Sequence, residues 1–217
     1  ETGHYGSQTA DAMALRFGIV PVELRQSVAD VLNKDVLEGW GGHASVGALG
    51  QTYLYRALSD YGYEETAFGI FRAQGYPGYG YLLDELHATT LWERKGGFDP
   101  MADPGGKKAP GRSLNHPFHS GYDGWFFEGL GGIRPLEDSV GFQEFELKPS
   151  FVKNLEFVDV SYTTDYGEIV SEWRREGDVV EWRIKVPQNS SALVDLPDRP
   201  RQRLEAGSYS YVIGGQE

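Results

Sequence analysis

Apolar residues recur at intervals of three and four through the N-terminal region, which is the spacing of amphipathic helices. Ala12, Leu15 and Phe17 form the apolar set of the first such segment, which begins after Ser7, a candidate N-cap, and ends at Gly18. Glycine-rich loops rather than strand patterns separate the helical segments, which favours stacked antiparallel helical pairs. Further helices are predicted over residues 22–37, 44–60, 64–75, 79–86 and 119–132.

The C-terminal region changes to strict alternation of apolar and polar residues, the pattern of half-buried strands. Turn signals at residues 164–167 and 176–178 join neighbouring segments into hairpins. This pattern predicts an antiparallel β-sandwich whose charged residues are solvated, and we expect no functional site in it. The predicted strands lie within residues 142–149, 155–164, 168–177, 178–187, 191–197 and 204–213.

The fold class is therefore α plus β in separate domains, with a helical domain over residues 1–136 and a β domain over 137–217. Wide apolar stripes and aromatic loops favour part of a helical toroid with a cleft at one end. A helical repeat array is the competing interpretation, but no self-similarity at a fixed period supports it.

The composition limits the kinds of chemistry and binding partner that the chain can have. The chain has 217 residues, no cysteine and a net charge of -12, so disulfides and thiolate chemistry are excluded and an acidic surface disfavours nucleic acids. No apolar run reaches the roughly 20 residues that a membrane span needs, and we expect no membrane partner. The chain begins without Met or a signal-peptide pattern, so we expect it to be part of a longer protein.

One acid has a position that sets it apart. Glu93 follows Trp92 in a stretch with loop signals on both sides, and loops on a rigid scaffold carry catalytic residues more often than element interiors do. The alternative is an ordinary surface ion pair with the adjacent Arg94. The pattern alone leaves both interpretations open.

Two histidines, His116 and His119, have a spacing that would allow them to share a metal ion, but the sequence offers no further ligand motif. A hydrogen bond from His116 to a polar substrate, or a structural role at a helix start, fits better. We therefore predict no metal and no other cofactor.

Aromatic side chains beside flexible glycines suit the apolar faces of sugars, and they occur around Trp40, His43 and Tyr79. The alternative is a wide helical core with an aromatic rim. Neither a dinucleotide fingerprint nor a phosphate-loop lysine accompanies the glycines, and no G-x-S-x-G motif is present.

Four stretches in a fixed order identify a resemblance: GSQTADAMALRFGIVP at 6–21, GYPGYGYLLDELHATTLWER at 75–94, SLNHPFHSGYDGWFFEGLGGIRP at 113–135 and GFQEFELKP at 141–149. They resemble the C-terminal half of bacterial α-L-rhamnosidases, glycoside hydrolase family 78. The resemblance implies part of an (α/α)6 barrel followed by a β-sandwich, and an inverting enzyme that releases terminal α-L-rhamnose from a carbohydrate substrate.

The same resemblance implies roles for individual residues. Glu93 matches the proposed general base, with Trp92 before it, and His116 matches the histidine that contacts the sugar. Trp40, Tyr79 and Trp125 match the pocket wall more loosely. The general acid lies upstream in the family, which implies a missing N-terminal half as partner and an isolated chain without activity.

Several alternatives stay open from the sequence. Pro117, His119 and Asp123 depart from the family pattern, and His119 with Arg94 would suit an anionic polysaccharide. A carbohydrate-binding fragment without catalysis, a uronyl hydrolase or a polysaccharide lyase using His116 and Tyr122 are competing functions. The family implies a bacterial periplasmic or secreted protein, and composition leaves the cytoplasm open.

Overall fold

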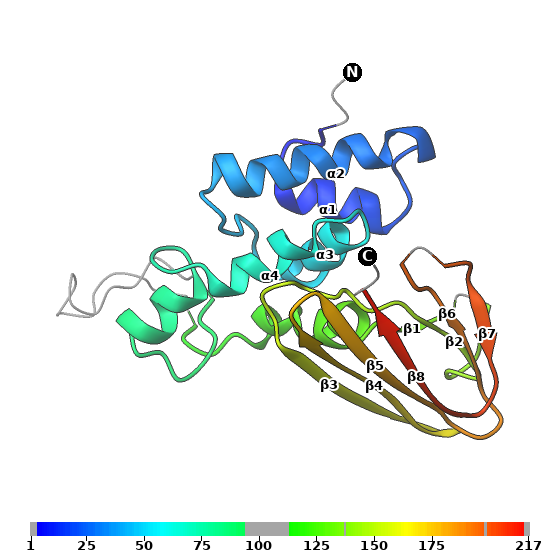
Figure 1. Cartoon of the computed structure of the whole chain (residues 1–217). Helices are drawn as coiled ribbons and strands as arrows, with labels where there is room; N and C mark the ends of the chain where they lie inside the picture. The colour runs from blue at the N-terminus through cyan, green and yellow to red at the C-terminus, as the bar shows by residue number, and fades with distance from the viewer. Residues whose placement is uncertain (1–3, 94–112, 137, 198, 215–217) are drawn as a thin grey trace, which may run out of the picture. The chain divides into compact units, whose positions relative to one another are not determined.

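The computed structural model describes residues 4–93, 113–136, 138–197 and 199–214. The chain forms two compact units, residues 1–123 and residues 124–217. The first unit is helical and the second is built mainly from strands (Figure 1). The predicted change from helices to strands is thereby confirmed.

In the first unit, the observed helices agree well with the predicted ones near the N-terminus and less well further along the chain. The Ser7 side chain caps the first helix by accepting a hydrogen bond from the Ala10 amide at 3.2 Å, as predicted. The elements are α1 (Gln8–Arg16), η1 (Val22–Leu24), α2 (Arg25–Lys34), η2 (Asp35–Gly39), α3 (Ala48–Ser59), α4 (Glu64–Arg72), η3 (Tyr81–Glu85) and η4 (Pro117–Ser120).

Close packing of α1 on α3 forms the centre of this unit. Leu54 and Leu58 of α3 are fully buried, as is Ala12 of α1. Gly50 lies where a Cβ atom would approach the Thr9 hydroxyl to 2.6 Å, so the absence of a side chain allows the two helices to come together.

Helices that the sequence predicts as continuous are interrupted by wider π-helical turns. The predicted helix 22–37 ends in the π turn η2, and the predicted helix 79–86 is the π turn η3 alone. The predicted helix 119–132 divides into part of η4, the short α5 (Asp123–Trp125) and the π turn η5 (Phe126–Leu130). Such turns recur at functional sites, and η2 and η3 lead into the loops that carry Trp40 and Glu93.

The second unit contains two four-stranded sheets, ordered β1-β2-β6-β7 and β3-β4-β5-β8 (Figure 1). Trp173 and Trp182 face each other in register on the second sheet and are fully buried. The strands are β1 (Ile133–Pro135), β2 (Glu144–Leu147), β3 (Phe157–Thr164), β4 (Gly167–Glu176), β5 (Val179–Val186), β6 (Ser191–Val194), β7 (Gln202–Leu204) and β8 (Gly207–Ile213).

One strand pair corrects the predicted antiparallel arrangement. β2 and β6 run parallel, with Glu144 opposite Ser191 and Leu147 opposite Val194. Alternation of apolar and polar residues marks the buried face of a strand but not the direction of its neighbour, so the sequence pattern did not reveal this pair. The three-residue strands β1 and β7 were also not predicted, because they are too short to alternate.

A glycine between η5 and β1 allows two backbone segments to approach closely. Gly132 has φ +71°, and a Cβ atom there would lie 2.2 Å from the Pro149 nitrogen. Gly177 in the turn between β4 and β5 has a similar φ of +60° but open space around it. Substitution of Gly177 therefore tests backbone strain alone, whereas substitution of Gly132 tests backbone strain and steric crowding together.

We expect Gly177→Ala to lower the free energy of unfolding by about 1 kcal/mol, the cost of a non-glycine residue in the left-handed region. Gly132→Ala should lower it by about 3 kcal/mol, because overlap with Pro149 adds to that strain. Urea unfolding followed by tryptophan fluorescence measures both variants. Equal losses would contradict the assigned crowding.

Within the described residues, no helix has the length and apolar character needed to cross a membrane.

Candidate active-site loops

Two segments distant in the sequence, residues 90–93 and 113–116, pair with each other. The Glu93 amide donates to the Ser113 carbonyl at 2.9 Å, and the His116 amide donates to the Leu91 carbonyl at 2.7 Å. The Thr90 hydroxyl donates to the Leu114 carbonyl. The two sequence motifs that carry Glu93 and His116 therefore form one local structure.

The carboxylate of Glu93 is held by the backbone of the opposite segment. Its Oε2 atom accepts a hydrogen bond from the Ser113 amide at 2.9 Å, and its main-chain carbonyl accepts one from His119 Nε2 at 2.7 Å. Within the described part of the chain, Oε1 accepts no hydrogen bond and the side chain is half-buried. One carboxylate oxygen is thus held by a backbone amide, whereas the other accepts no hydrogen bond from the described residues.

Trp92, which precedes Glu93 in the chain, is buried, with 8% of its surface exposed. His116 is half-buried, and its ring lies edge-on to those of Phe118 and His119 at centroid distances of 5.6 Å. Its Nδ1 atom is buried and has no hydrogen-bond partner among the described residues. An unpartnered buried nitrogen is costly, which suits a polar group supplied by a ligand.

A surface ion pair of Glu93 with Arg94 stays a prediction, because Arg94 lies outside the described residues. A metal shared by His116 and His119 finds no support among the described residues, which contain no group of three or more side chains arranged to bind a metal ion.

A second loop carries Trp40 and His43 and follows the π turn η2. Trp40 is 47% exposed. The His43 ring lies between two backbone carbonyls, with Nδ1 3.0 Å from the Trp40 oxygen and Nε2 3.1 Å from the Gln74 oxygen. The loop borders a groove of about 510 Å³ against α4. No hydrogen bond among the described residues joins Trp40 or His43 to Glu93, so the structure does not bring these two sets of candidates into direct contact.

Tyr79 belongs to a buried aromatic cluster with Tyr55, Phe71 and Tyr122. Its side chain is 6% exposed and its hydroxyl donates to Gln51 Oε1 at 3.2 Å. Burial raises the pKa of Tyr79, so the hydroxyl stays protonated. This placement supports a core role, and a sugar contact by Tyr79 stays a prediction.

Trp125 lies in the second unit, where it is 2% exposed and packs on Gly129, whose added Cβ would lie 2.1 Å from the indole nitrogen. Asp123 ends the first unit. Burial raises the pKa of its carboxyl, and both burial and the nearby Asp123 raise the pKa of Tyr122.

The sequence did not reveal that Ser113 and His119 form hydrogen bonds with Glu93. Ser113 acts through its backbone amide, which any residue other than proline supplies, so its identity carries no signal. His119 was noted only as a possible metal or anion contact, whereas it is 5% exposed and bonded to a carbonyl.

Comparison with known protein families gives two adjacent matches. A family described as the bacterial alpha-L-rhamnosidase 6 hairpin glycosidase domain matches residues 1–130. The bacterial alpha-L-rhamnosidase C-terminal domain matches residues 132–210.

Individual relatives agree with these matches. An alpha-L-rhamnosidase of Formosa agariphila is 36% identical over 189 residues, which is 87% of this chain and 19% of the relative. One from an Alteromonas species, strain LOR, is 28% identical over 192 residues, covering 86% of this chain and 20% of the relative. The chain therefore spans about a fifth of the length of these relatives.

Solved structures show the same fold. The alpha-L-rhamnosidase of Dictyoglumus thermophilum superposes with a TM-score of 0.84 at 25% identity, over 99% of this chain and 26% of its own. The enzyme of Streptomyces avermitilis, solved with L-rhamnose, gives a TM-score of 0.80 at 25% identity, over 95% of this chain and 21% of its own.

Proposed function

The chain belongs to the bacterial α-L-rhamnosidase family, and on this premise we propose that it forms the C-terminal part of a glycoside hydrolase. The enzyme removes terminal α-L-rhamnose from oligosaccharides, polysaccharides or other glycosides. The observation that carries the proposal is the pairing of the Glu93 and His116 segments in a chain that two rhamnosidase domains cover in order.

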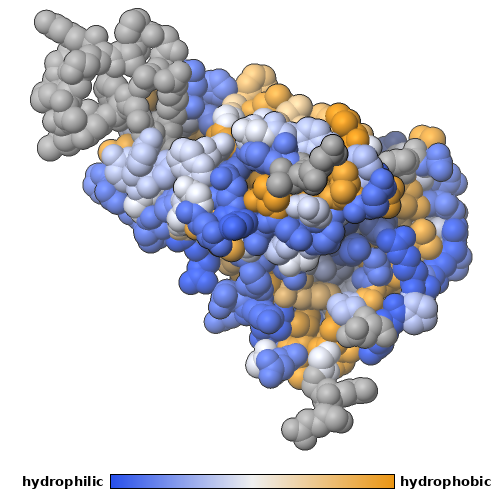
Figure 2. Space-filling view, turned by 90° about the horizontal axis from the view of Figure 1, so that it is seen from above, coloured by the Kyte–Doolittle hydropathy of each residue, from blue (hydrophilic) through white to orange (hydrophobic). Residues whose placement is uncertain are grey.

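The architecture we propose is part of an (α/α)6 barrel over residues 1–136 and a β-sandwich domain over residues 137–217. The remainder of the barrel comes from an N-terminal part of the same protein. Exposed apolar side chains of the helical unit support this, since Ile19, Val22 and Leu49 are 64%, 73% and 59% exposed. Figure 2 shows hydrophobic patches among hydrophilic residues on the face that it displays.

We assign Glu93 as the general base of an inverting mechanism. Its open Oε1 atom takes a proton from a water molecule whose oxygen bonds to the anomeric carbon. The bond from that carbon to the leaving oxygen breaks as a second carboxyl group protonates this oxygen. The hydrogen bonds from Ser113 and His119 limit the orientations of Glu93, which favours a single position for the attacking water.

An inverting enzyme needs its two carboxyl groups about 6.5–9.5 Å apart, so that the water fits between the base and the sugar. We propose that the general acid lies in the N-terminal part of the protein, because the chain spans only 19% of its Formosa relative. The isolated chain then lacks half of the catalytic pair.

The remaining site residues form or support the sugar pocket in this proposal. His116 directs a hydrogen bond at a hydroxyl group, and Trp92 supports the base from the inner side. The exposed ring of Trp40 and the neighbouring His43 supply a stacking surface. Tyr79 and Trp125 act from the core, where their rings hold the loops that follow them.

The complete protein should hydrolyse p-nitrophenyl α-L-rhamnoside, whereas residues 1–217 alone should release no nitrophenol. Proton NMR of the reaction should detect the β-anomer of rhamnose first, because attack by water inverts the anomeric carbon. Release of the α-anomer first would refute the inverting mechanism, and with it the assignment of Glu93 as the base of a single displacement by water. Binding of rhamnosides without any turnover would instead identify a carbohydrate-binding protein, and turnover by the isolated chain would place the acid within it.

A further inference from the structure

The parallel pair β2–β6 brings three loops of the second unit to the same end of the strands of one sheet. Because these strands run in the same direction, the segments that enter them, residues 138–143 and 187–190, lie at one end. β7 is antiparallel to β6, so the residues that leave β7, at 205–206, reach this end as well. An entirely antiparallel sheet would have separated the two entering loops.

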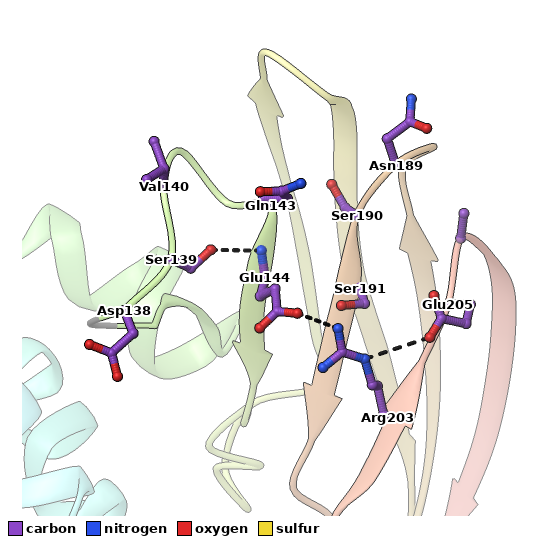
Figure 3. A pocket seen from close by; sticks show the side chains of 11 residues that line it. Asp138, Ser139, Val140, Gln143, Glu144, Asn189, Ser190, Ser191, Arg203 and Glu205 are labelled. Atoms are coloured by element: carbon purple, nitrogen blue, oxygen red, sulfur yellow. Dashed lines mark hydrogen bonds and ion pairs between the residues drawn. The ribbon is translucent and has the colours of Figure 1, made fainter.

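These loops enclose a groove with a volume of about 590 Å³, within the range of about 300–1,000 Å³ that small-ligand sites have. Figure 3 shows a continuous chain of polar contacts along it. The Ser139 hydroxyl accepts from the Glu144 amide at 2.8 Å, the Glu144 carboxylate pairs with Arg203, and Arg203 pairs with Glu205 at 3.6 Å. The groove therefore has a defined polar wall.

The charge of this wall excludes several kinds of ligand. Arg203 is the cation among the described residues that line it, and the adjacent Glu144 raises the pKa of its guanidinium, so it stays charged and paired. Asp138 and Glu205 add further negative charge, which repels phosphates and uronates. The described residues contain no cluster suited to a metal ion. An uncharged ligand rich in hydroxyl groups satisfies these limits.

Hydrogen-bonding groups without partners lie beside the polar wall. The amide side chains of Gln143 and Asn189 are exposed at the groove. Ser190 is 5% exposed, and its Oγ atom has no hydrogen-bond partner among the described residues. A hydroxyl can donate one hydrogen bond and accept others, and its hydrogen rotates about the C–O bond, so Ser190 can pair with either a donor or an acceptor. Amides, hydroxyls and carboxylates together match the alternating donors and acceptors of a sugar.

We propose that this groove, built from residues of the second unit alone, is a second carbohydrate site that holds an uncharged stretch of the glycan. No aromatic side chain is found among the described residues that line it, so stacking does not contribute and we expect weak binding, with a Kd on the order of 1 mM. The choice of a rhamnose-containing glycan rests on the proposed function, whereas the preference for an uncharged polyol rests on the groove itself.

The test uses the complete protein with Glu93→Gln, so that bound glycan is not hydrolysed. Isothermal titration with a neutral, α-linked oligorhamnoside is compared before and after the double change Gln143→Ala and Asn189→Gly. Asn189 has φ +62°, so glycine keeps its backbone conformation while removing the amide. Loss of two hydrogen bonds should weaken binding at the groove by about tenfold or more.

A matched control changes the same residue types at exposed positions away from the groove, Gln26→Ala and Asn154→Gly, and should leave the affinity unchanged. With Glu93 intact, the groove variant should raise KM for polymeric glycan but leave kcat/KM for p-nitrophenyl α-L-rhamnoside unaltered. Circular dichroism verifies that both double variants fold, as their exposed positions lead us to expect.

Each outcome decides between this inference and the proposed function. If the oligosaccharide binds the groove variant as tightly as the parent protein, or does not bind at millimolar concentration, the groove assignment is overturned. The enzyme assignment is tested separately, and it stands if the protein with Glu93 intact hydrolyses the nitrophenyl substrate. A short oligolysine that binds the groove in place of the oligosaccharide would identify a cation-binding surface and overturn the inference. Groove binding without any hydrolysis overturns only the proposed function.

Discussion

Glu93→Gln in the complete protein should lower kcat for p-nitrophenyl α-L-rhamnoside by about 10²- to 10⁴-fold, the range in which a general base contributes. KM should change little, because glutamine keeps the size of the side chain and its amide oxygen can take the place of Glu93 Oε2 and accept the Ser113 amide hydrogen bond. The base acts on the water in the transition state, so the loss appears in kcat rather than in substrate binding.

Initial rates over a range of substrate concentrations separate the two parameters. Glu23→Gln is the matched control, since Glu23 is an exposed acid beside the start of α2 and should leave kcat unchanged. Added azide should restore turnover to Glu93→Ala, because azide attacks the sugar without giving up a proton. The product should be the β-rhamnosyl azide. Full activity of Glu93→Gln would refute the assignment of the base.

Trp173→Ala should lower the free energy of unfolding of the second unit by about 3–5 kcal/mol, which is the cost of truncating a fully buried tryptophan. The ring contacts Phe151 edge-on at 5.7 Å, and its indole nitrogen donates to the Leu130 carbonyl at 3.0 Å. The substitution leaves a cavity and also leaves that buried carbonyl without its donor, and each adds to the loss.

Urea denaturation monitored by far-ultraviolet circular dichroism measures this loss. Trp173→Phe keeps most of the ring volume but not the donor, so it should lie between wild type and Trp173→Ala. Val212→Ala on β8 is the control, because Val212 is 55% exposed and its truncation should change stability by less than about 0.5 kcal/mol. A loss below about 1 kcal/mol for Trp173→Ala would show that the core closes around the vacated space.

The period of apolar residues was sufficient to place most secondary structure. It predicts the region of α1 with its Ser7 cap, and alternation predicts β4 and β5 nearly to their ends. It fails over residues 119–132, where one helix is predicted and several short turns occur. A periodic pattern shows which face is buried, but π turns and α turns present similar faces over so few residues.

The candidate site was predictable only through its motifs. Glu93 and His116 belong to stretches that resemble a known family. The two hydrogen bonds that hold Glu93, however, come from Ser113 and His119, which lie 20 and 26 residues further along the chain. One of these contacts comes from a backbone amide and the other reaches a backbone carbonyl. Every residue except proline has both of these main-chain groups, so the choice of side chain at position 113 does not reveal the contact.

The sequence by itself determined the change from helices to strands, the acidic charge and the two motifs that meet at Glu93. Tertiary structure alone decided that β2 and β6 run parallel, and hence that Gln143, Ser190 and Arg203 line one groove. The physical reason is that alternation reports the environment of a strand's two faces, whereas the direction of its neighbour depends on backbone hydrogen bonds between segments far apart in the chain.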